Sequence, residues 1–420
     1  MIDWAEIVGR DFVAPGSVDD QVDGVAPDRV VRPGTVAEVQ AAVRTGAALV
    51  ASGFGAHLDI GAPPRRLDVL VRLDRLDSIL DHEAADMTVT VESGCPLATL
   101  QDVLASAGQW LPLDPPRPQR TTVGGLIAAN LGGPLRASQG GVRDLLLGLH
   151  VVGAGGTLVR GGGRVVKNVA GYDLPKLHVG ALGSVGVVVQ ATFKVRPRPE
   201  REAAVVIGCR SGPEAAEAAL VLRDVLDPLW IEVSGAGGLP DGPGDGAAVA
   251  VGVAGLGAEV EHGRRLVEER ATSRGWRTVR VEDGRALRAR LGEFDVEPAA
   301  ALLRAATLPG KIGPLLGAVD AAAARHGASV RTLAHAANGV VRIAVALADD
   351  VPPLVRELRA GLEADGGSLV LHRAGPAVKA GVDVWGDFGP GRHLMRRIKE
   401  AFDPDDVFAP GRFVEGGVRP

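Results

Sequence analysis

The chain has 420 residues, 46 basic and 51 acidic side chains, and a formal charge of −5. This length suggests two or three domains, and 46% hydrophobic with 23% charged residues is ordinary globular composition, which excludes general disorder. The near-neutral charge gives no footprint for nucleic acid or an anionic membrane, the 3% aromatic content argues against base-stacking platforms, and two cysteines cannot form a disulfide framework or a zinc knuckle.

The beginning of the sequence lacks a basic stretch followed by an apolar run, and no segment reaches about 18 uninterrupted apolar residues. We therefore expect no signal peptide, no membrane-spanning helix and a cytoplasmic location. A peripheral link to a membrane through partner subunits is left open.

The first 200 residues predict short strands, glycine-rich turns and few long helices. Thr35 and Glu38 form a capping-box pattern, so we expect a helix from Val36 to Thr45. Two apolar runs flank a Gly-Ala-Gly-Gly turn at Gly153, which indicates a hairpin. The other predicted elements are strands at Ala48–Ser52, Val69–Leu73, Thr88–Glu92 and Val185–Val195 and a helix at Pro96–Ala107.

Past Pro197 the pattern changes to strands and helices that alternate. The β-α-β-β-α-β order fits a ferredoxin-like sheet with helices on one face, so the predicted fold class is α+β. We place domain boundaries near 200 and 375, giving a domain at 1–200, a second at 201–375, and a C-terminal segment at 376–420. Predicted strands are Ala204–Ile207, Leu229–Val233, Ala247–Val253, Thr278–Val281, Val330–Ala334 and Val340–Leu347; predicted helices are Pro213–Leu226, Ala258–Arg274, Lys311–His326, Pro352–Ala364 and His393–Phe402.

A glycine-rich loop, Ser52–Leu58, follows the predicted strand at Ala48–Ser52. Glycine permits positive φ and lets backbone N–H groups approach an anion closely, as a phosphate cradle requires. A tight turn is the simpler interpretation of this loop taken alone. This loop therefore indicates a cofactor site only if other glycine-rich segments of the chain support that interpretation.

Two further glycine-rich segments accompany that loop. In Thr121–Arg136, the adjacent Gly124 and Gly125 allow the backbone to approach a cofactor, and Asn130 and Arg136 offer polar groups. The third segment, Lys167–Leu177, contains the single tyrosine of the chain, Tyr172, and continues into Gly180–Val189. Each segment alone is weak evidence, but the three in this order are a specific pattern.

These segments carry a family resemblance. The chain from Val31 to Val195 resembles the FAD-binding domain of the vanillyl-alcohol-oxidase/p-cresol-methylhydroxylase (PCMH-type) superfamily. Within it, TVGGLIAANLGGPLR, VRDLLLGLHVV, GGRVVKNVAGYDLPKL and the late FDPDDVFAPGRF are similar to the FAD-binding subunits of bacterial glycolate oxidases. The resemblance covers residues 30–200 closely and 375–415 well, and the middle in pattern only.

The resemblance implies a two-lobed FAD domain with the dinucleotide between its lobes and a cap domain, 201–375, closing over the flavin. It places the diphosphate on backbone N–H groups of the loop from Gly53 to His57, and backbone polar groups of Val187 and Val188 at the pyrimidine side of the flavin. The cofactor-binding residues it implies are Ser52, Gly53, Phe54, Gly55, Ala56, His57, Leu58, Pro115, Thr122, Gly124, Gly125, Asn130, Gly133, Arg136, Val187 and Val188.

Four residues depart from the family pattern, and the first of them, Ser52, replaces an arginine. Ala56 stands where relatives with covalent flavin carry histidine, and His57 comes one residue later, so we expect non-covalent FAD. Phe54 replaces a glycine and would cost about 1 kcal/mol if its φ were positive. Ala409 replaces an asparagine before Pro-Gly, which puts one flavin-side polar contact in doubt.

Other chemistries fit less well. The turn at Gly153 lacks the third glycine of a dinucleotide fingerprint and leads into a strand. The nine histidines are scattered, so we expect no metal site and interpret His335 as a satisfied strand residue. Oxidation of a hydroxyacid needs a base and a cation for the carboxylate; His372-Arg373 and Arg392-His393 are candidates, but surface positions are commoner for such pairs. We assign no catalytic residue.

The resemblance implies an FAD subunit of a glycolate oxidase complex, whose partners are a catalytic FAD subunit that oxidises glycolate to glyoxylate and an iron–sulfur subunit. Two cysteines are too few to hold a cluster in this chain. One alternative is a self-sufficient FAD-dependent oxidase or dehydrogenase of another hydroxyacid or alcohol. A second alternative, motivated by Phe54 and Ala409, is a structural subunit that has lost FAD.

Overall fold

The computed structural model describes residues 2–163, 173–224, 226–235, 239, 242, 244 and 246–413. The chain divides into two compact units: Met1–Leu131, Gly141–Arg198 and Asp383–Pro420 form the first, and Gly132–Gly140 with Pro199–Val382 form the second. The short segment Gly132–Gly140 thus belongs to the second unit although it lies within the predicted first domain. The predicted Lys167–Tyr172 part of the third glycine-rich segment lies outside the described residues.

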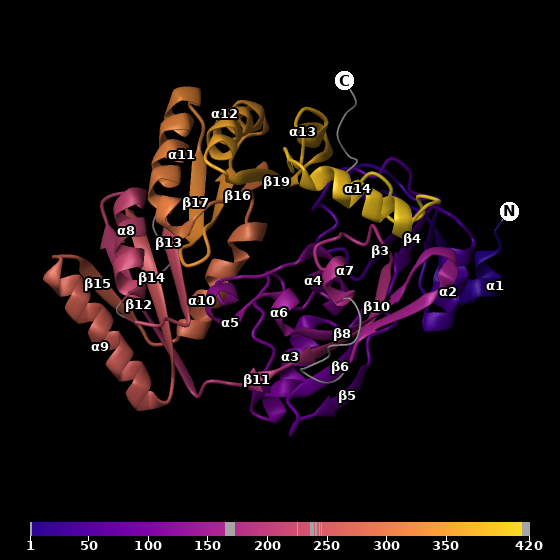
Figure 1. Ribbon diagram of the computed structural model, residues 1–420, viewed down its shortest axis with the longest axis horizontal. Coiled ribbons are helices and arrows are strands. Elements are labelled where there is room, and N and C mark those ends of the chain that lie inside the picture. The colour runs from indigo at the N-terminus through magenta and orange to yellow at the C-terminus, as the bar shows by residue number, and fades with distance from the viewer. Residues whose placement is uncertain are drawn as a thin grey trace. The chain divides into compact units, whose positions relative to one another are not determined.

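The first unit contains two main sheets (Figure 1). In the smaller sheet, of order β1-β2-β4-β3, β4 is parallel to both β2 and β3. The larger sheet, of order β5-β6-β10-β8-β9, is antiparallel throughout. The strands are β1 (Val13–Pro15), β2 (Arg29–Val31), β3 (Leu49–Ser52), β4 (Val69–Arg72), β5 (Ile79–Glu83), β6 (Thr88–Glu92), β8 (Leu146–Val152), β9 (Leu158–Gly162) and β10 (Val187–Lys194), with the small pair β7 (Gln109–Trp110) and β11 (Arg196–Pro197).

Helices of the first unit begin and end largely as local chemistry dictates. The side chain of Thr35 accepts from the Glu38 N–H and caps α2, as predicted, but the Glu38 carboxylate accepts from the N–H of Gly34 rather than from Thr35. The hairpin at Gly153 is confirmed by β8 and β9. The helices are α1 (Trp4–Val8), α2 (Val36–Arg44), α3 (Leu97–Ser106), α4 (Val123–Ala129), α6 (Val142–Leu145), α7 (Pro175–His178) and α14 (Gly391–Phe402).

The C-terminal segment is built into the first unit beside β3. Leu49 donates its N–H to Val407 at 2.8 Å and accepts from the N–H of Ala409 at 2.8 Å. Phe408 between them is fully buried in the same apolar cluster as Leu49. These contacts place the chain's last described residues next to the loop that follows β3.

The second unit confirms the α+β prediction, and its sheet contains two ferredoxin-like halves. Its antiparallel sheet has the order β15-β12-β14-β13-β17-β18-β16-β19 within the described residues, which is two ferredoxin-like 4-1-3-2 sheets joined between β13 and β17. Strands β16 and β19 have no counterpart in the sequence prediction. The strands are β12 (Arg201–Cys209), β13 (Trp230–Ser234), β14 (Ala247–Gly255), β15 (Arg277–Val281), β16 (Ala301–Ala306), β17 (Val330–His335), β18 (Val340–Val345) and β19 (Ser368–Ala374).

Four long helices of this unit lie along one face of its sheet, as predicted and as Figure 1 shows. On this face Ala203 and Val253 pack with Val260 of α9. No helix in the described part of the chain combines the length and the apolar character of a membrane span. The helices are α5 (Arg136–Gln139), α8 (Gly212–Arg223), α9 (Gly257–Ser273), α10 (Gly284–Gly292), α11 (Ile312–His326), α12 (Val351–Ala364) and α13 (Pro376–Ala380).

Candidate cofactor site

The loop after β3, residues 52–58, presents backbone donors that the chain itself does not use. The N–H groups of Gly53, Phe54, Gly55 and Ala56 form no hydrogen bond with any described residue. Backbone N–H groups are rarely left unpaired in folded proteins, and consecutive ones in a turn form a concavity suited to anions. This loop therefore has the donor set that a diphosphate requires.

The turn at this loop depends on Gly55, whose φ is +71°. Phe54 is not among the described residues with positive φ, so the cost that we attached to its side chain does not arise. The Phe54 side chain is 41% exposed instead. The replacement of a glycine by phenylalanine is thus compatible with the cradle.

Gly53 is needed for a different reason, the close approach of the second glycine-rich segment. A Cβ on Gly53 would lie 2.3 Å from Cγ2 of Thr122, the residue that caps α4 by accepting from the Gly125 N–H at 3.2 Å. Gly124 donates its N–H to the carbonyl of Ser93 at 2.7 Å, and a Cβ there would be 3.0 Å from the Ser93 Cβ. The predicted approach of these glycines to a cofactor stays a prediction; what the structure shows is that the space at Gly53 and Gly124 is taken by the chain's own Thr122 and Ser93.

Two arginines that the sequence analysis did not single out fix the carbonyl side of the loop. Arg120 donates to the carbonyl of Phe54 at 3.0 Å, and the buried Arg412 donates to the carbonyl of Leu58 at 2.8 Å. The His57 ring shares a 2.7 Å hydrogen bond with Thr121 Oγ1. Carbonyl oxygens would repel an anion, and the two arginines engage two of them while the N–H groups stay available. Arg120 also adds a positive charge, whereas the charge of Arg412 is shared with Asp23.

A pocket opens on this loop and on α4. Arg120 and Arg412 are its charged walls, and Leu182, whose φ is +51°, contributes an apolar one. A left-handed backbone is uncommon for a bulky residue other than glycine, and residues with this conformation concentrate at ligand sites. The lining residues are Val50, Ala51, Ser52, Gly53, Phe54, Gly55, Ala56, His57, Leu58, Arg120, Thr122, Gly125, Ala128, Ala129, Leu182 and Arg412.

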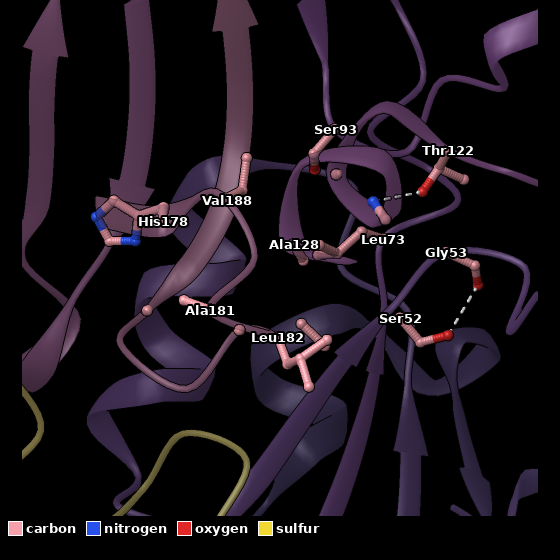
Figure 2. A pocket seen from close by; sticks show the side chains of 15 residues that line it. Ser52, Gly53, Leu73, Ser93, Thr122, Ala128, His178, Ala181, Leu182 and Val188 are labelled. Carbon is pink, nitrogen blue, oxygen red and sulfur yellow. Dashed lines mark hydrogen bonds between the residues drawn. The ribbon is translucent and has the colours of Figure 1, made fainter. Parts of the chain in front are cut away.

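A second pocket adjoins the first and shares Ser52, Gly53, Thr122 and Leu182 with it (Figure 2). Its wall is mostly small and apolar residues, with four polar ones: Ser52, Ser93, Thr122 and His178. The full lining is Ala51, Ser52, Gly53, Leu73, Ser93, Thr122, Gly124, Gly125, Ala128, His178, Ala181, Leu182, Gly183, Gly186 and Val188. We refer to the two pockets together as the slot: the loop with the unused N–H groups lines one of them, and mostly small apolar residues line the other.

Of the four polar residues of this pocket, Ser93 and His178 were not predicted. Ser93 Oγ is buried without a hydrogen-bond partner, and the His178 side chain, 7% exposed, has none among the described residues. Burial lowers the pKa of His178 to about 4, so its ring is neutral at physiological pH. An orphaned hydroxyl and a neutral imidazole are groups that a ligand with ring nitrogens and carbonyls can satisfy, so these residues fit an FAD.

The structure brings together most, but not all, of the predicted cofactor residues. Those from Ser52 to Leu58, with Thr122, Gly124, Gly125 and Val188, line the two pockets. Pro115, Asn130 and Val187 line neither; Asn130 ends α4 with φ +49°, and Val187 is buried in the core. Gly133 and Arg136 belong to the second unit. Ala409, with φ +43°, is buried in an apolar cluster and lines neither pocket.

The predicted chemistry-bearing residues outside this slot are paired or exposed. His335 is buried and shares a hydrogen bond with Glu232, consistent with a satisfied strand residue. The described residues contain no group of three or more His, Cys, Asp or Glu side chains that could hold a metal ion. Arg373 is buried in β19, whereas Arg392 and His393 are exposed on α14.

Comparisons with known proteins agree with this geometry. A family model described as "FAD binding domain" matches residues 27–162. The chain is 39% identical over 163 residues to glycolate oxidase subunit GlcE of Escherichia coli (39% of this chain, 46% of that protein) and 26% identical over 408 residues to glycolate oxidase subunit GlcD of Bacillus subtilis (88% and 84%). It is 36% identical over 177 residues to a D-2-hydroxyglutarate dehydrogenase of Xanthomonas citri (41% and 38%). The match spans less than half the length of the first and third of these relatives.

Solved structures give the class of fold. The chain superposes on p-cresol methylhydroxylase with a TM-score of 0.76 at 18% identity, covering 98% of this chain and 95% of that one, and on a 4-ethylphenol oxidase from Gulosibacter chungangensis with 0.74 at 17% (97% and 95%). The fold is therefore that of the PCMH-type flavoproteins, as the resemblance implied. Residues 27–162 of this chain match an FAD-binding domain, and FAD is the cofactor that the comparisons support.

Proposed function

We propose that this chain is the FAD-binding subunit of a complex that oxidises glycolate to glyoxylate. The observation that carries the proposal is the slot, whose free N–H groups and Arg120 lie within residues 27–162, the segment that matches an FAD-binding domain, in a chain that is 39% identical over 163 residues to a glycolate oxidase subunit. The partners proposed are a catalytic FAD subunit and an iron–sulfur subunit. The proposed location is the cytoplasm, with membrane association arising through partners.

The residues of the slot have distinct proposed roles. The N–H groups of Gly53, Phe54, Gly55 and Ala56, with the charges of Arg120 and Arg412, hold the diphosphate of FAD. The apolar pocket that contains Ser93 and His178 takes the part of the cofactor that must be shielded from water. Oxidation of an α-hydroxyl to a carbonyl removes two electrons and two protons, and bound FAD supplies the electron acceptor.

Non-covalent binding is part of the proposal, because Ala56 occupies the position of the flavin-linked histidine and the His57 ring is engaged with Thr121. The purified chain should be yellow, contain about one FAD per chain, and release it on acid precipitation. A flavin retained in the pellet would contradict non-covalent binding. A colourless protein that FAD cannot reconstitute would instead favour a structural subunit.

The subunit role is tested by assay with and without partners. The isolated chain should oxidise glycolate barely, and co-purification with a catalytic FAD subunit and an iron–sulfur subunit should restore turnover. Substantial glycolate turnover by the isolated chain would reject the subunit role.

A self-sufficient FAD-dependent dehydrogenase is the second candidate. The match to the Bacillus protein favours it, because that match runs through 88% of this chain and so includes both units. Anaerobic mixing with a panel of 2-hydroxyacids and alcohols separates the two candidates. Bleaching of the flavin by one of them, without any partner, would support the self-sufficient enzyme.

A further inference from the structure

The four polar residues of the apolar pocket differ in whether the chain already uses their side chains. Ser52 Oγ donates to the carbonyl of Gly53 at 3.3 Å. Thr122 Oγ1 accepts from the N–H of Gly125 at 3.2 Å, as the cap of α4. Two of the four polar side chains therefore have partners within the described chain, and the other two, those of Ser93 and His178, do not.

The apolar pocket is uncharged near neutral pH. Apart from His178, none of its described lining residues carries an ionisable side chain, and burial lowers the pKa of His178 to about 4. An ion placed among small apolar walls would lose its hydration without gaining a counter-charge. This pocket therefore suits an uncharged ring of a ligand, with a few polar groups to orient it, better than it suits a phosphate.

The main chain of Ser93 is fixed between two elements that line the pocket. Its N–H donates to the carbonyl of Val189 in β10 at 3.0 Å, and its carbonyl accepts from the N–H of Gly124 in α4 at 2.7 Å. A Cβ on Gly124 would lie only 3.0 Å from the Ser93 Cβ, so the two residues are in close contact. The position of the Ser93 side chain is thus set by the chain itself.

The hydroxyl is the one polar group of Ser93 that the chain leaves unused. Ser93 is 1% exposed, its Oγ has no hydrogen-bond partner, and the hydroxyl points from the wall toward the middle of the pocket (Figure 2). A buried hydroxyl without a partner destabilises the folded state. The free protein therefore carries an unfavourable group at a point that faces the ligand.

We propose that the Ser93 hydroxyl binds FAD directly, through a hydrogen bond to a nitrogen or carbonyl oxygen of one of the cofactor's rings. A serine hydroxyl can donate and accept, so it matches either kind of ring atom. The inference rests on the proposed function only for the binding of FAD in the slot, and it requires neither glycolate nor a partner subunit. It implies that removing the hydroxyl changes cofactor affinity and the stability of the free protein in opposite directions.

Ser93→Ala in the full-length chain tests this directly. Release of FAD from the loaded protein, followed on dilution by the recovery of flavin fluorescence, should be about tenfold faster than in wild type. The dissociation constant from titration of FAD into the FAD-free protein should rise by a similar factor. The FAD-free variant should nevertheless unfold at the wild-type Tm or above it, because the unpaired buried hydroxyl is gone.

Thr90→Val is the matched control, because it removes a buried hydroxyl that already has a partner. Thr90 lies on β6, shortly before Ser93, and its Oγ1 shares a 3.0 Å hydrogen bond with Thr192 Oγ1. Thr90 lines neither pocket of the slot. Valine has nearly the same shape, so the variant should unfold at a lower Tm without FAD and release FAD at the wild-type rate. This is the reverse of the pattern expected for Ser93→Ala.

Two results would overturn the role of Ser93 while leaving the slot in place. Release of FAD from Ser93→Ala at the wild-type rate would show that the hydroxyl does not bind the cofactor. A lower Tm of FAD-free Ser93→Ala than of FAD-free wild type would show that the hydroxyl supports the fold instead.

The remaining results separate this inference from the proposed function. A wild-type chain that takes up no FAD would overturn both the slot and the role of Ser93. Faster FAD release from Ser93→Ala, in a protein that the partner assay shows not to oxidise glycolate, would support the role of Ser93 and reject the proposed substrate.

Discussion

Arg412 donates to the carbonyl oxygen of Leu58 at 2.8 Å, although 354 residues separate them in the chain. The same nitrogen donates to the carbonyl of Ile60, and the other terminal nitrogen faces Asp23. Arg412 is 2% exposed. The far end of the 52–58 loop is thus fixed by the C-terminal return of the chain as well as by its own strand.

Substitution of Arg412 should therefore disturb both the fold and the cofactor. Arg412→Met leaves the carbonyls of Leu58 and Ile60 without this donor and removes the cation that faces the buried Asp23 carboxylate, so we expect the free energy of unfolding to fall by about 3–5 kcal/mol and the affinity for FAD to fall at least tenfold. FAD titration and denaturant unfolding measure the two effects. Arg65→Met is the control, because Arg65 pairs with Asp406 at the surface and such pairs contribute about 1 kcal/mol or less. Wild-type FAD affinity in Arg412→Met would show that the anchoring does not matter for the cofactor.

Gly53 should tolerate no side chain. In Gly53→Ala the new Cβ meets Thr122 Cγ2 at 2.3 Å, so the loop and α4 must separate and FAD should be lost. Thr122→Ala in the same chain removes Cγ2 and should restore part of the binding. Gly391→Ala in α14 is the matched control, because a Cβ there meets nothing within 4 Å and alanine favours a helix. Normal flavin content in Gly53→Ala would refute the close-packing argument.

The glycine-rich segments were predictable from the sequence because they respond to local constraints. Gly55 needs positive φ and Gly53 and Gly124 need close approach, and both needs leave glycine in the sequence. Arg412 and Arg120 were not predictable in the same way. A guanidinium that donates to a distant carbonyl follows no spacing rule, so nothing near either residue marks it.

The second unit shows a similar division. The four long helices and the other six strands were predicted. Helix α10 was not, and β16 and β19 were missed because Arg304 in one and His372 and Arg373 in the other interrupt the apolar runs. Arg136 was assigned to FAD because it follows the Gly124-Gly125 motif in sequence. Its helix packs on β13, a tertiary relationship that sequence proximity does not reveal, and the assignment of Arg136 to FAD stays a prediction.

His178 should make stability depend on pH. Its folded-state pKa, about 4, is below the ordinary value of about 6.5, so the unfolded chain takes up a proton that the folded chain resists. The stabilisation is complete above pH 6.5 and is lost as the pH falls toward 4, by about 3 kcal/mol in all. His178→Leu should remove this part of the pH dependence. Denaturant unfolding at pH 7.5 and 4.5 measures it, and an identical loss in the variant and the wild type would show that other groups account for it.

Lys399 connects three segments of the first unit through Ser184, Asp403 and Phe408. A substitution of Lys399 therefore tests whether the packing around the apolar pocket matters for FAD binding without changing a residue that lines the pocket. The Lys399 ammonium donates to the carbonyls of Ser184 at 3.0 Å and Phe408 at 2.8 Å and pairs with Asp403, which itself accepts from the Val407 N–H at 2.9 Å. Lys399→Met leaves the Asp403 charge buried without its cation, so we expect a loss of about 3–5 kcal/mol in unfolding free energy.

Adding Asp403→Asn to Lys399→Met should recover part of that loss, because the uncompensated charge is removed while an acceptor for the Val407 N–H remains. Arg396→Met, which breaks an exposed pair with Glu400 on the same helix, should cost about 1 kcal/mol or less. Ser184 lies between Gly183 and Gly186, which line the apolar pocket, so FAD affinity should fall together with stability in Lys399→Met and recover with it in the double variant. If stability falls while FAD affinity stays at the wild-type value, the C-terminal return supports the fold without shaping the pocket.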